Sequence, residues 1–212
     1  MPVILEHWKF VATENSATSV LPDGCRDLII KQSKGCAPIC FISDLANSFD
    51  QVEMQAGDCF SGFRLLPGAR INADGLLGAI ADGQTDAQIK ERLHDFVTQT
   101  PNVSEALACL SGGITNVAQA AADLGVQPRS LQRLLKQQTQ KTPAFWLRLA
   151  KARKAVLRIT PFSNLADLSY DLGFADQPHM TREFRHWFGV TPRKVKTDTG
   201  WKTQNLRLGY GA

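Results

Sequence analysis

One sequence pattern is written twice in the second half of the chain. Residues 117–143 and 165–192 align at an offset of 48, which becomes 49 after one inserted residue. Both copies contain an Asp-Leu-Gly triplet, at 123–125 and 171–173, and both end with Thr-Pro. Two copies of a single supersecondary unit are the simplest explanation. The repeat therefore constrains the fold of this half more strongly than any other feature of the sequence.

Each copy has the pattern of a helix-turn-helix unit. Gly125 and Gly173 follow apolar stripes of helical spacing and can adopt the left-handed conformation that ends a helix. Pro128 suits the first turn of a following helix, and Asp176 is a suitable N-cap. A turn of three to four residues between two short helices is typical of DNA-binding proteins. The stripes consist of Val117, Ala121 and Leu124 in the first copy and of Leu165, Leu168 and Leu172 in the second.

The second helix of each copy carries polar side chains of the kinds that contact DNA. Arg pairs with guanine and Gln with adenine in the major groove, whereas Lys and Arg also bind phosphates. Because two such helices occur in a basic half-chain, we expect a DNA-binding surface rather than a merely solvated one. The predicted contact residues are Arg129, Ser130, Gln132, Arg133 and Lys136 on the first helix and Gln177, His179, Thr181, Arg182 and Arg185 on the second. Glu183 is placed further round the second helix.

A single helix is predicted between the two copies, over residues 143–158. Its apolar residues Phe145, Leu149, Ala152 and Val156 recur at i, i+4, i+7 and i+11. A helix of this length spans roughly 24 Å, so the two recognition helices would lie about one DNA turn, or about 34 Å, apart. Its cations either contact the intervening phosphates or form a solvated face; they are Arg148, Lys151, Arg153, Lys154 and Arg158.

Short strand-like runs alternate with turn-prone segments through the first half of the chain. This pattern predicts a small sandwich or barrel. Residues 86–98 change to helical spacing, and the Thr-Pro-Asn sequence at 100–102 then breaks the chain, so we place a domain boundary at residues 99–103. The predicted strands lie within residues 3–10, 27–30, 38–42, 50–54 and 59–66.

The charge of the chain divides between its halves. Residues 1–100 hold 8 basic and 13 acidic residues, whereas residues 101–212 hold 16 basic and 7 acidic ones, a formal charge of +9. This split predicts two units with different partners. No apolar run approaches the 18 residues of a membrane span, and the N-terminus lacks the basic region of a secretory signal. Five Cys, an odd count, favour reduced thiols and a cytoplasmic location.

Patterns of catalysis and of metal binding are absent from the sequence. The four His are scattered, and neither a Gly-rich phosphate loop nor a Gly-x-Ser-x-Gly elbow is present. We therefore expect a protein that is not an enzyme and that has no catalytic residues, cofactor or metal ligands. The polar cluster at 23–27 is either a thiol-reactive turn, in which Arg26 lowers the pKa of Cys25, or a tight turn around a buried Cys.

Residues 104–196 resemble the DNA-binding domain of AraC-type transcriptional regulators, the AraC/XylS family. The likeness is strongest over residues 165–196, LADLSYDLGFADQPHMTREFRHWFGVTPRKVK. There the turn glycine and the final Gly-x-Thr-Pro sequence agree with the family pattern. It implies seven helices, with two helix-turn-helix units joined by a long helix. The chain departs from the family at Gln127, where Ser usually caps the first recognition helix. By position, the resemblance implies base contacts from Arg129, Gln132, Arg133, Gln177, His179, Thr181 and Arg182.

A second hypothesis places a zinc or redox centre in the first half. DNA-repair proteins that transfer alkyl groups join the same module to a Cys-rich zinc domain, and Cys25, Cys36, Cys40 and Cys59 lie in this half. Against this hypothesis, the sequence has no Cys-x-x-Cys pair, the spacing that structural zinc sites favour.

The first half also resembles the short β-rich sensor domain that precedes this module in some family members. LPDGCRDLII (21–30) and GFRLLPGA (62–69) carry the likeness, which implies a cupin-like barrel without the paired His of metal-binding cupins. The expected fold is α+β: a β-rich effector-binding or dimerisation domain at 1–100, an all-α double helix-turn-helix domain at 101–196, and a tail at 197–212. The predicted function is sequence-specific transcriptional regulation. The implied partners are double-stranded DNA, read in the major groove over two adjacent turns, a small-molecule effector, RNA polymerase and a second copy of the chain, with no membrane.

Overall fold

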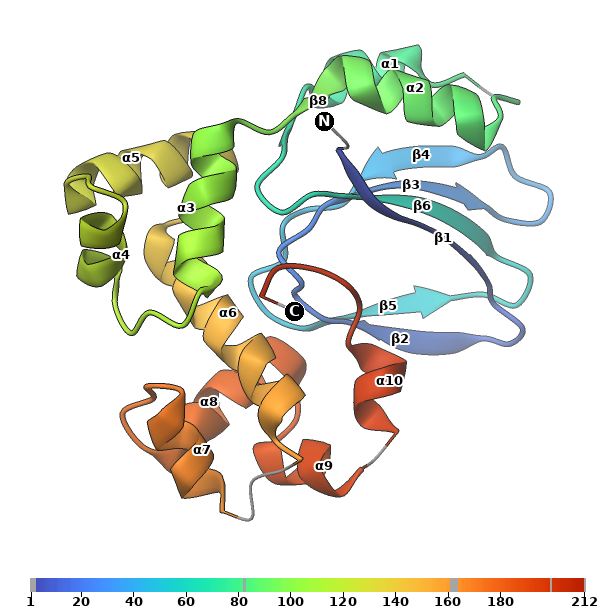
Figure 1. The fold of residues 1–212 in the computed structure, drawn as a ribbon. Coiled ribbons are helices and arrows are strands. Elements are labelled where there is room, and N and C mark those ends of the chain that lie inside the picture. Colours follow the sequence, from blue (N-terminus) through green and yellow to red (C-terminus); the bar gives the residue numbers. More distant parts are fainter. Residues whose placement is uncertain (1–2, 82, 161–163, 199, 212) are drawn as a thin grey trace.

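The computed structural model describes residues 3–81, 83–160, 164–198 and 200–211. It confirms the predicted α+β fold, because strands dominate the first half of the chain and helices form the second (Figure 1). Within the described residues the strands form three antiparallel sheets, with the orders β1-β6-β3-β4, β2-β5 and β7-β8. The strands are β1 (Ile4–Val11), β2 (Ser16–Val20), β3 (Asp27–Gln32), β4 (Ile39–Ile42), β5 (Asp50–Met54), β6 (Cys59–Leu65), β7 (Arg70–Ile71) and β8 (Val97–Thr98).

One face of the four-stranded sheet packs against two helices, α1 (Ala73–Ala79) and α2 (Asp86–Phe96). Leu28 of β3 and Phe63 of β6 are paired in the register, so their side chains point to this same face. Both are fully buried, together with Leu76 of α1 and Leu93 of α2. The first half therefore has its own core, between the sheet and the helices that cover it in Figure 1.

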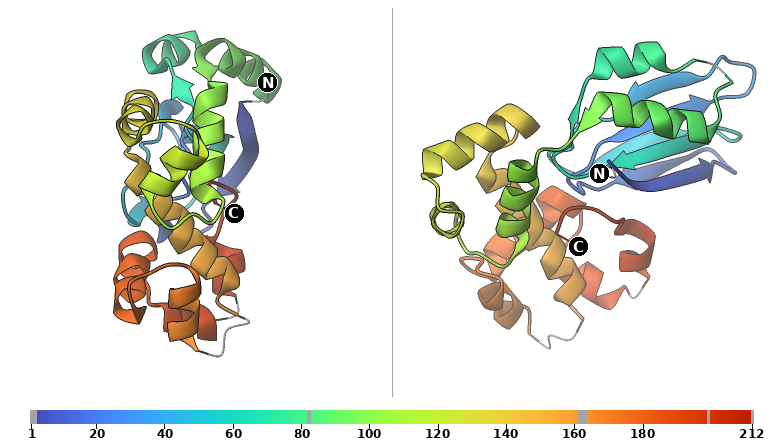
Figure 2. Two further views of the ribbon diagram at one scale, coloured as in Figure 1. Left: turned by 60° about the vertical axis from the view of Figure 1, so that its left-hand side comes forward. Right: turned by 45° about the horizontal axis from the view of Figure 1, so that its top comes forward.

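Seven helices lie in the described part of residues 101–197, as the resemblance implied. The long helix α6 runs through the middle of this half, and the pairs α4–α5 and α7–α8 lie at its two ends (Figures 1 and 2). Trp146 and Leu149 of α6 are fully buried in one core with Phe184 and Trp187 of α8. The helices are α3 (Pro101–Ser111), α4 (Val117–Asp123), α5 (Pro128–Thr139), α6 (Pro143–Arg158), α7 (Leu165–Asp171), α8 (Gln177–Phe188) and α9 (Pro192–Thr197).

The C-terminal segment, residues 200–211, begins with α10 (Trp201–Asn205) and then passes between the helices and the β-rich half (Figure 1). Its Tyr210 is buried. The backbone N–H of Tyr210 donates to the carbonyl oxygen of Asp23 at 2.7 Å, and its hydroxyl donates to the carbonyl oxygen of Leu107 in α3 at 3.1 Å. The segment therefore contacts both halves of the molecule.

Four elements of the first half were not predicted. Two are the short paired strands β7 and β8; residues 97–98 were expected to continue the helix, which instead ends at Phe96. The other two are β2 and α1. The five residues of β2 are all exposed, so the strand has no apolar alternation to reveal it. Helix α1 contains two glycines in seven residues, which lowers its intrinsic helix propensity. It is held by the buried Leu76 and by Asn72, whose side chain accepts a hydrogen bond from the N–H of Gly75. No helix in the described ranges is long and apolar enough to cross a membrane.

Candidate DNA-binding interface

Helices α4 and α5 form the first helix-turn-helix unit around Gly125. Gly125 has a φ of +65°, and nothing lies within 4 Å of the position a Cβ would take, so the backbone conformation favours glycine here. The N–H of Val126 donates to the carbonyl oxygen of Ala121 at 2.9 Å, which satisfies an acceptor at the end of α4. At the other end, the Asn116 side chain accepts from the N–H of Gln119 at 2.9 Å. The chain therefore turns sharply between two short helices, of which α4 has a side-chain N-cap.

Helix α5 buries a narrow apolar stripe and exposes its polar residues. Leu131 and Leu135 are buried in the helical core. The side chain of the N-cap residue Gln127 makes no capping hydrogen bond. The outer face carries exposed residues, four of them spaced at i, i+3, i+4 and i+7: Arg129, Gln132, Arg133 and Lys136, with Ser130 beside them.

Helices α7 and α8 repeat this geometry. Gly173 has a φ of +69°, and the N–H of Phe174 donates to the carbonyl oxygen of Ser169 at 2.9 Å. Asp176 is the N-cap of α8, as predicted, and its side chain accepts from the N–H of His179. A carboxylate at a helix N-terminus also interacts favourably with the helix dipole. The second recognition helix therefore has a stronger N-terminal cap than the first.

The inner face of α8 is anchored by large side chains. Met180, Phe184 and Trp187 are fully buried. On the opposite face Arg182 and Arg185 are exposed, and so is Gln177 in the first turn. The arrangement presents two guanidinium groups on a helix whose position is fixed by its core.

His179 and Thr181 differ from the other predicted contact residues because both are half-buried and hydrogen-bonded locally. The Thr181 hydroxyl donates to the carbonyl oxygen of Gln177 at 3.0 Å. The Nδ1 atom of His179 accepts from the N–H of Ala175 at 3.2 Å, so the proton of the neutral ring is assigned to Nε2. That Nε2 lies 3.8 Å from the Glu183 carboxylate. The two side chains are therefore held in fixed orientations by contacts within the protein.

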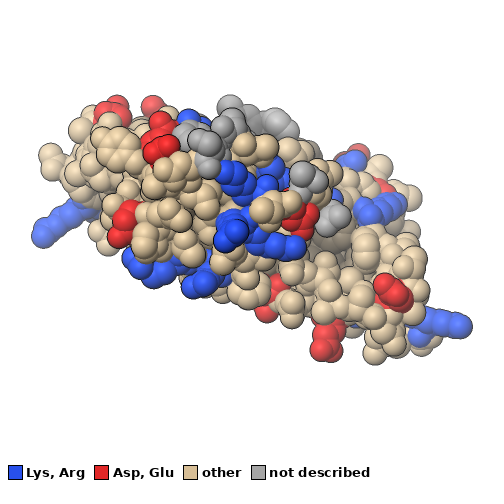
Figure 3. Space-filling model, turned by 90° about the horizontal axis from the view of Figure 1, so that it is seen from below, with Lys and Arg blue, Asp and Glu red and all other residues tan. Residues whose placement is uncertain are grey.

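The ten predicted contact residues are thus divided equally between two helices, and eight of them are exposed. Within the described residues no carboxylate forms an ion pair with Arg129, Arg133, Arg182 or Arg185. Figure 3 views the molecule from the side of α7–α9 and shows Lys and Arg gathered near the middle of that face. An array of guanidinium groups without acidic partners is suited to bind phosphates and guanine edges.

Glu183 joins α8 to the connecting helix. It is only 7% exposed, and its carboxylate accepts a hydrogen bond of 2.8 Å from the indole N–H of Trp187. Two nitrogens of the Arg148 guanidinium donate to the same carboxylate, at 2.9 to 3.2 Å. The sequence analysis placed Glu183 further round α8 from the predicted contact residues and gave it no other role. Its structural role was missed because its partner lies 35 residues away in the chain.

Three of the other cations of α6, Lys151, Arg153 and Arg158, are also used inside the protein, which corrects the expectation that they contact phosphates or solvent. Arg153 has no exposed surface. The Lys151 ammonium donates to the carbonyl oxygens of Thr115 and Gly173, at 2.9 and 3.1 Å, and therefore bridges the two helix-turn-helix units. Arg158 forms an ion pair of 2.7 Å with Asp171 of α7. The connector holds the units in place through these contacts.

The loop between β4 and β5 reaches the C-terminal ends of both recognition helices. Leu45 of this loop is buried in the core of the helical half. The Asn47 side chain accepts a hydrogen bond from the Lys141 ammonium, just beyond α5. The N–H of Phe49 donates to the carbonyl oxygen of His186 in α8 at 3.2 Å. The β-rich half is therefore docked against the helical half near the C-terminal ends of α5 and α8.

The cysteines do not form the centre that the second hypothesis required. Cys25 is buried, and burial together with the Asp23 carboxylate raises the pKa of its thiol, which favours the tight-turn interpretation over a reactive thiol. Cys36 and Cys59 are exposed, and Cys40 is half-buried. In the described part of the chain, no group of three or more His, Cys, Asp or Glu is placed to hold a metal ion.

Comparison with known proteins identifies the helical half. A family of helix-turn-helix domains matches residues 120–198. The chain is 27% identical over 100 residues to the HTH-type transcriptional regulator ArgR of Pseudomonas aeruginosa, covering 44% of this chain and 30% of that protein. It is 39% identical over 79 residues to the HTH-type transcriptional activator RhaS of Escherichia coli, covering 36% of this chain and 28% of that protein. The chain thus spans less than a third of either relative.

Among solved structures, the chain is similar to a transcriptional regulator with an AraC-type DNA-binding domain from Chromobacterium violaceum. The TM-score is 0.41 and the identity 26%, over 46% of this chain and 90% of that chain. The helical half, which contains two helix-turn-helix units, is therefore similar to the helix-turn-helix domains of transcriptional regulators. This similarity agrees with the resemblance of the sequence to AraC-type domains.

Proposed function

We propose that the protein is a transcriptional regulator whose helices α5 and α8 enter the major groove in two adjacent turns of DNA. The observation that carries this proposal is the repeated unit itself. Each copy presents an exposed helical face with two arginines that have no acidic partner within the described residues. The similarity of residues 120–198 to helix-turn-helix domains supports the same function.

The side chains on the two faces divide by chemistry. Arg129, Arg133 and Arg182 can donate two hydrogen bonds to guanine, and Gln132 and Gln177 can pair with adenine. His179 and Thr181 contribute a donor and an acceptor, respectively, from fixed positions. Lys136, Arg185 and Ser130 are suited to phosphate contacts, which supply affinity without sequence preference.

The β-rich half is proposed as the regulatory unit, with residues 1–100 and 101–196 as the two domains. Its β4–β5 loop contacts the ends of α5 and α8, so a change in the first half is transmitted directly to the recognition helices. A small-molecule effector or a second copy of the chain would act through this contact. Once the protein is bound to DNA, its proposed partner is RNA polymerase.

The decisive experiment is an unbiased selection of DNA sequences with the full chain. The expected result is one short site with two conserved boxes about 10 base pairs apart, one for each recognition helix. A palindromic or directly repeated site would indicate that two copies bind together. Recovery of no preferred sequence would overturn the proposal of specific binding.

A variant test separates base readout from phosphate binding. Arg182→Ala should weaken binding to the selected site by about ten- to a hundredfold and change binding to random DNA far less. Arg92→Ala, which removes an exposed arginine of α2, is the matched control and should leave both affinities unchanged. Equal losses on the selected and random DNA would show that Arg182 contacts phosphate only.

A further inference from the structure

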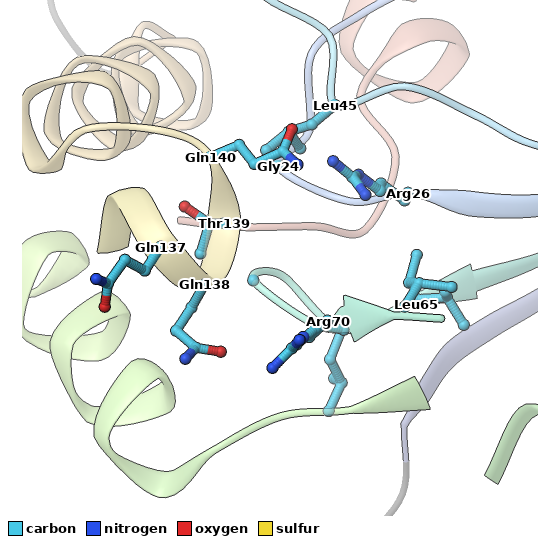
Figure 4. Close-up of a pocket in the computed structure, with 13 residues that line it drawn as sticks. Gly24, Arg26, Leu45, Leu65, Arg70, Gln137, Gln138, Thr139 and Gln140 are labelled. Atoms are coloured by element: carbon cyan, nitrogen blue, oxygen red, sulfur yellow. The ribbon is translucent and has the colours of Figure 1, made fainter. Parts of the chain in front are cut away.

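A cavity of about 460 Å³ lies where the β-rich half meets the C-terminal end of α5. One wall is formed by Arg26, by Leu65 and by the turn that leads to Arg70 in β7. The facing wall is the last turn of α5, residues 137–140 (Figure 4). The volume falls within the range of small-molecule sites, and the cavity is lined by both halves of the protein. Any ligand in it would therefore touch the first recognition helix and the β-rich half at once.

Two arginines give one side of this cavity a positive charge. In Figure 4 the guanidinium groups of Arg26 and Arg70 extend into the space between the two walls. The ion pairs of the described residues include neither of them. Lys141 lies nearby, and its pKa is lowered by burial and by the positive charges of Arg26 and Lys136. Guanidinium groups in a concave site bind carboxylates through pairs of parallel hydrogen bonds.

The opposite side of the cavity favours positively charged groups and hydrogen-bond donors. It is the C-terminal end of a helix, where carbonyl oxygens remain without intrahelical partners and the dipole favours positive charge and hydrogen-bond donors. Gln138 and Gln140 add side-chain amides to this wall, and Gln137 also lines the cavity. Gln140 has a φ of +59°, the left-handed conformation that ends the helix and turns the chain toward the β-rich half. This wall therefore suits hydroxyl or amino groups rather than a second carboxylate.

We propose that this cavity binds a small organic acid that carries hydroxyl or amino groups. Its carboxylate lies against Arg26 and Arg70, and its hydroxyl or amino groups face the amides and carbonyl oxygens at the end of α5. The binding site itself stands independently of DNA recognition. Its regulatory meaning rests on the proposed function, because the ligand would link the β-rich half to the recognition helix α5.

A ligand in this cavity would affect regulation because it contacts both walls. A ligand held by both walls stabilises the arrangement in which the end of α5 lies against the β-rich half. It changes DNA affinity only to the extent that it binds this arrangement more tightly than others. The ligand and DNA would then alter each other's affinity by the same factor.

The test begins with binding of small molecules to the full chain in the absence of DNA. A collection of metabolites containing hydroxy acids, amino acids, simple dicarboxylates and neutral sugars is screened by thermal shift, and positive compounds are measured by calorimetry. We expect the tightest ligands to be hydroxy or amino acids, with the corresponding amide of each acid binding at least tenfold more weakly. Arg26→Gln and Arg70→Gln should each weaken the same acids about tenfold, whereas Arg92→Gln should not.

Several outcomes would overturn the site. A screen in which no organic acid binds does so, as does an acid that binds the Arg26→Gln/Arg70→Gln double variant with wild-type affinity. If the double variant fails to fold, the comparison of each acid with its amide on the wild-type chain decides the role of the charge. Because binding is measured without DNA, loss of the ligand site and loss of DNA recognition are observed separately.

Discussion

The buried guanidinium of Arg153 in α6 donates a hydrogen bond of 2.7 Å to the backbone carbonyl oxygen of Arg207 in the C-terminal segment. From the other side, the guanidinium of Arg64 in β6 donates to the carbonyl oxygen of Leu208 at 3.3 Å. Arg64 is itself held by ion pairs with Glu6, Asp23 and Asp27. The C-terminal segment is therefore fastened between an arginine of the DNA-binding half and an arginine of the β-rich half.

This arrangement predicts that Arg153→Ala destabilises the whole protein. The substitution removes the donor to the Arg207 carbonyl oxygen and leaves a cavity where the long side chain is packed. We expect a loss of about 2 to 3 kcal/mol in the free energy of unfolding. Urea unfolding followed by tryptophan fluorescence measures it, because Trp146, Trp187 and Trp201 all lie in the helical core.

Arg92→Ala is the matched control for this prediction. Arg92 is exposed on the surface of α2, and its guanidinium lies 4.0 Å from the Asp95 carboxylate. An exposed pair of this kind contributes less than about 1 kcal/mol. Equal stability of the two variants would contradict the structural role assigned to Arg153.

Arg153 also shows what the sequence can and cannot predict. Periodicity and turn glycines predicted the recognition helices and the connector, because local spacing determines which face of a helix is apolar. The same reasoning placed Arg153 among the cations of an open connector. Its hydrogen-bond acceptor lies 54 residues away, and the acceptors of Lys151 lie 36 and 22 residues away. Such partners are set by how the units pack, which spacing along one helix does not reveal.

The same limit applies to the candidate cavity. Arg26 directly precedes β3 and Arg70 begins β7, and residues 137–140 close the cavity only because the two halves are docked. The strand predictions failed at the fully exposed β2 and at the two-residue strands β7 and β8, which are too short to show an alternation. The spacing of apolar residues in α5 and α8 predicted which side chains are exposed, and eight of the ten predicted contact residues are exposed in the structure.

The N-caps of the two recognition helices provide a second prediction. Gln127 makes no capping hydrogen bond, whereas Asp176 accepts one from the N–H of His179. Gln127→Ser should therefore stabilise the protein by about 0.5 to 1 kcal/mol, and Asp176→Ala should destabilise it by about 1 kcal/mol. Both are measured by urea unfolding. A stabilising effect of Asp176→Ala would show that its capping bond is not formed in solution.

The environments of the thiols predict their reactivity. Cys36 and Cys59 are exposed, whereas Cys25 is buried with a thiol whose pKa is raised by burial and by Asp23. Because the thiolate is the reactive form, a maleimide should modify Cys36 and Cys59 rapidly in the native protein and Cys25 only after unfolding. Peptide mapping after timed labelling measures this order. Modification of Cys25 as fast as Cys59 would contradict the buried turn.

The raised pKa of Cys25 also implies a dependence of stability on alkaline pH. A thiol that stays protonated in the folded state while it ionises in the unfolded state favours unfolding above about pH 8.5, the ordinary pKa of Cys. Stability from this group is present below that pH and is lost as the pH rises. Cys25→Ala should flatten the decline in the urea midpoint between pH 8 and 10, relative to Cys36→Ala.

Asp58 predicts a complementary dependence on acid. Its carboxylate accepts hydrogen bonds from the Lys31 ammonium at 2.8 Å and from the Ser33 hydroxyl at 2.6 Å, and these partners lower its pKa to about 2. The stabilisation is therefore present above the unfolded-state pKa of about 4 and is lost as the pH falls toward 2. The free energy of unfolding of Asp58→Asn should fall less than that of the wild type over this interval. In Lys31→Met the folded-state pKa of Asp58 should rise, so the contribution of Asp58 to stability should disappear at a higher pH. Urea midpoints measured at steps from pH 5 to pH 2 test both. Identical acid profiles for the wild type and Asp58→Asn would exclude this carboxylate as a source of acid sensitivity.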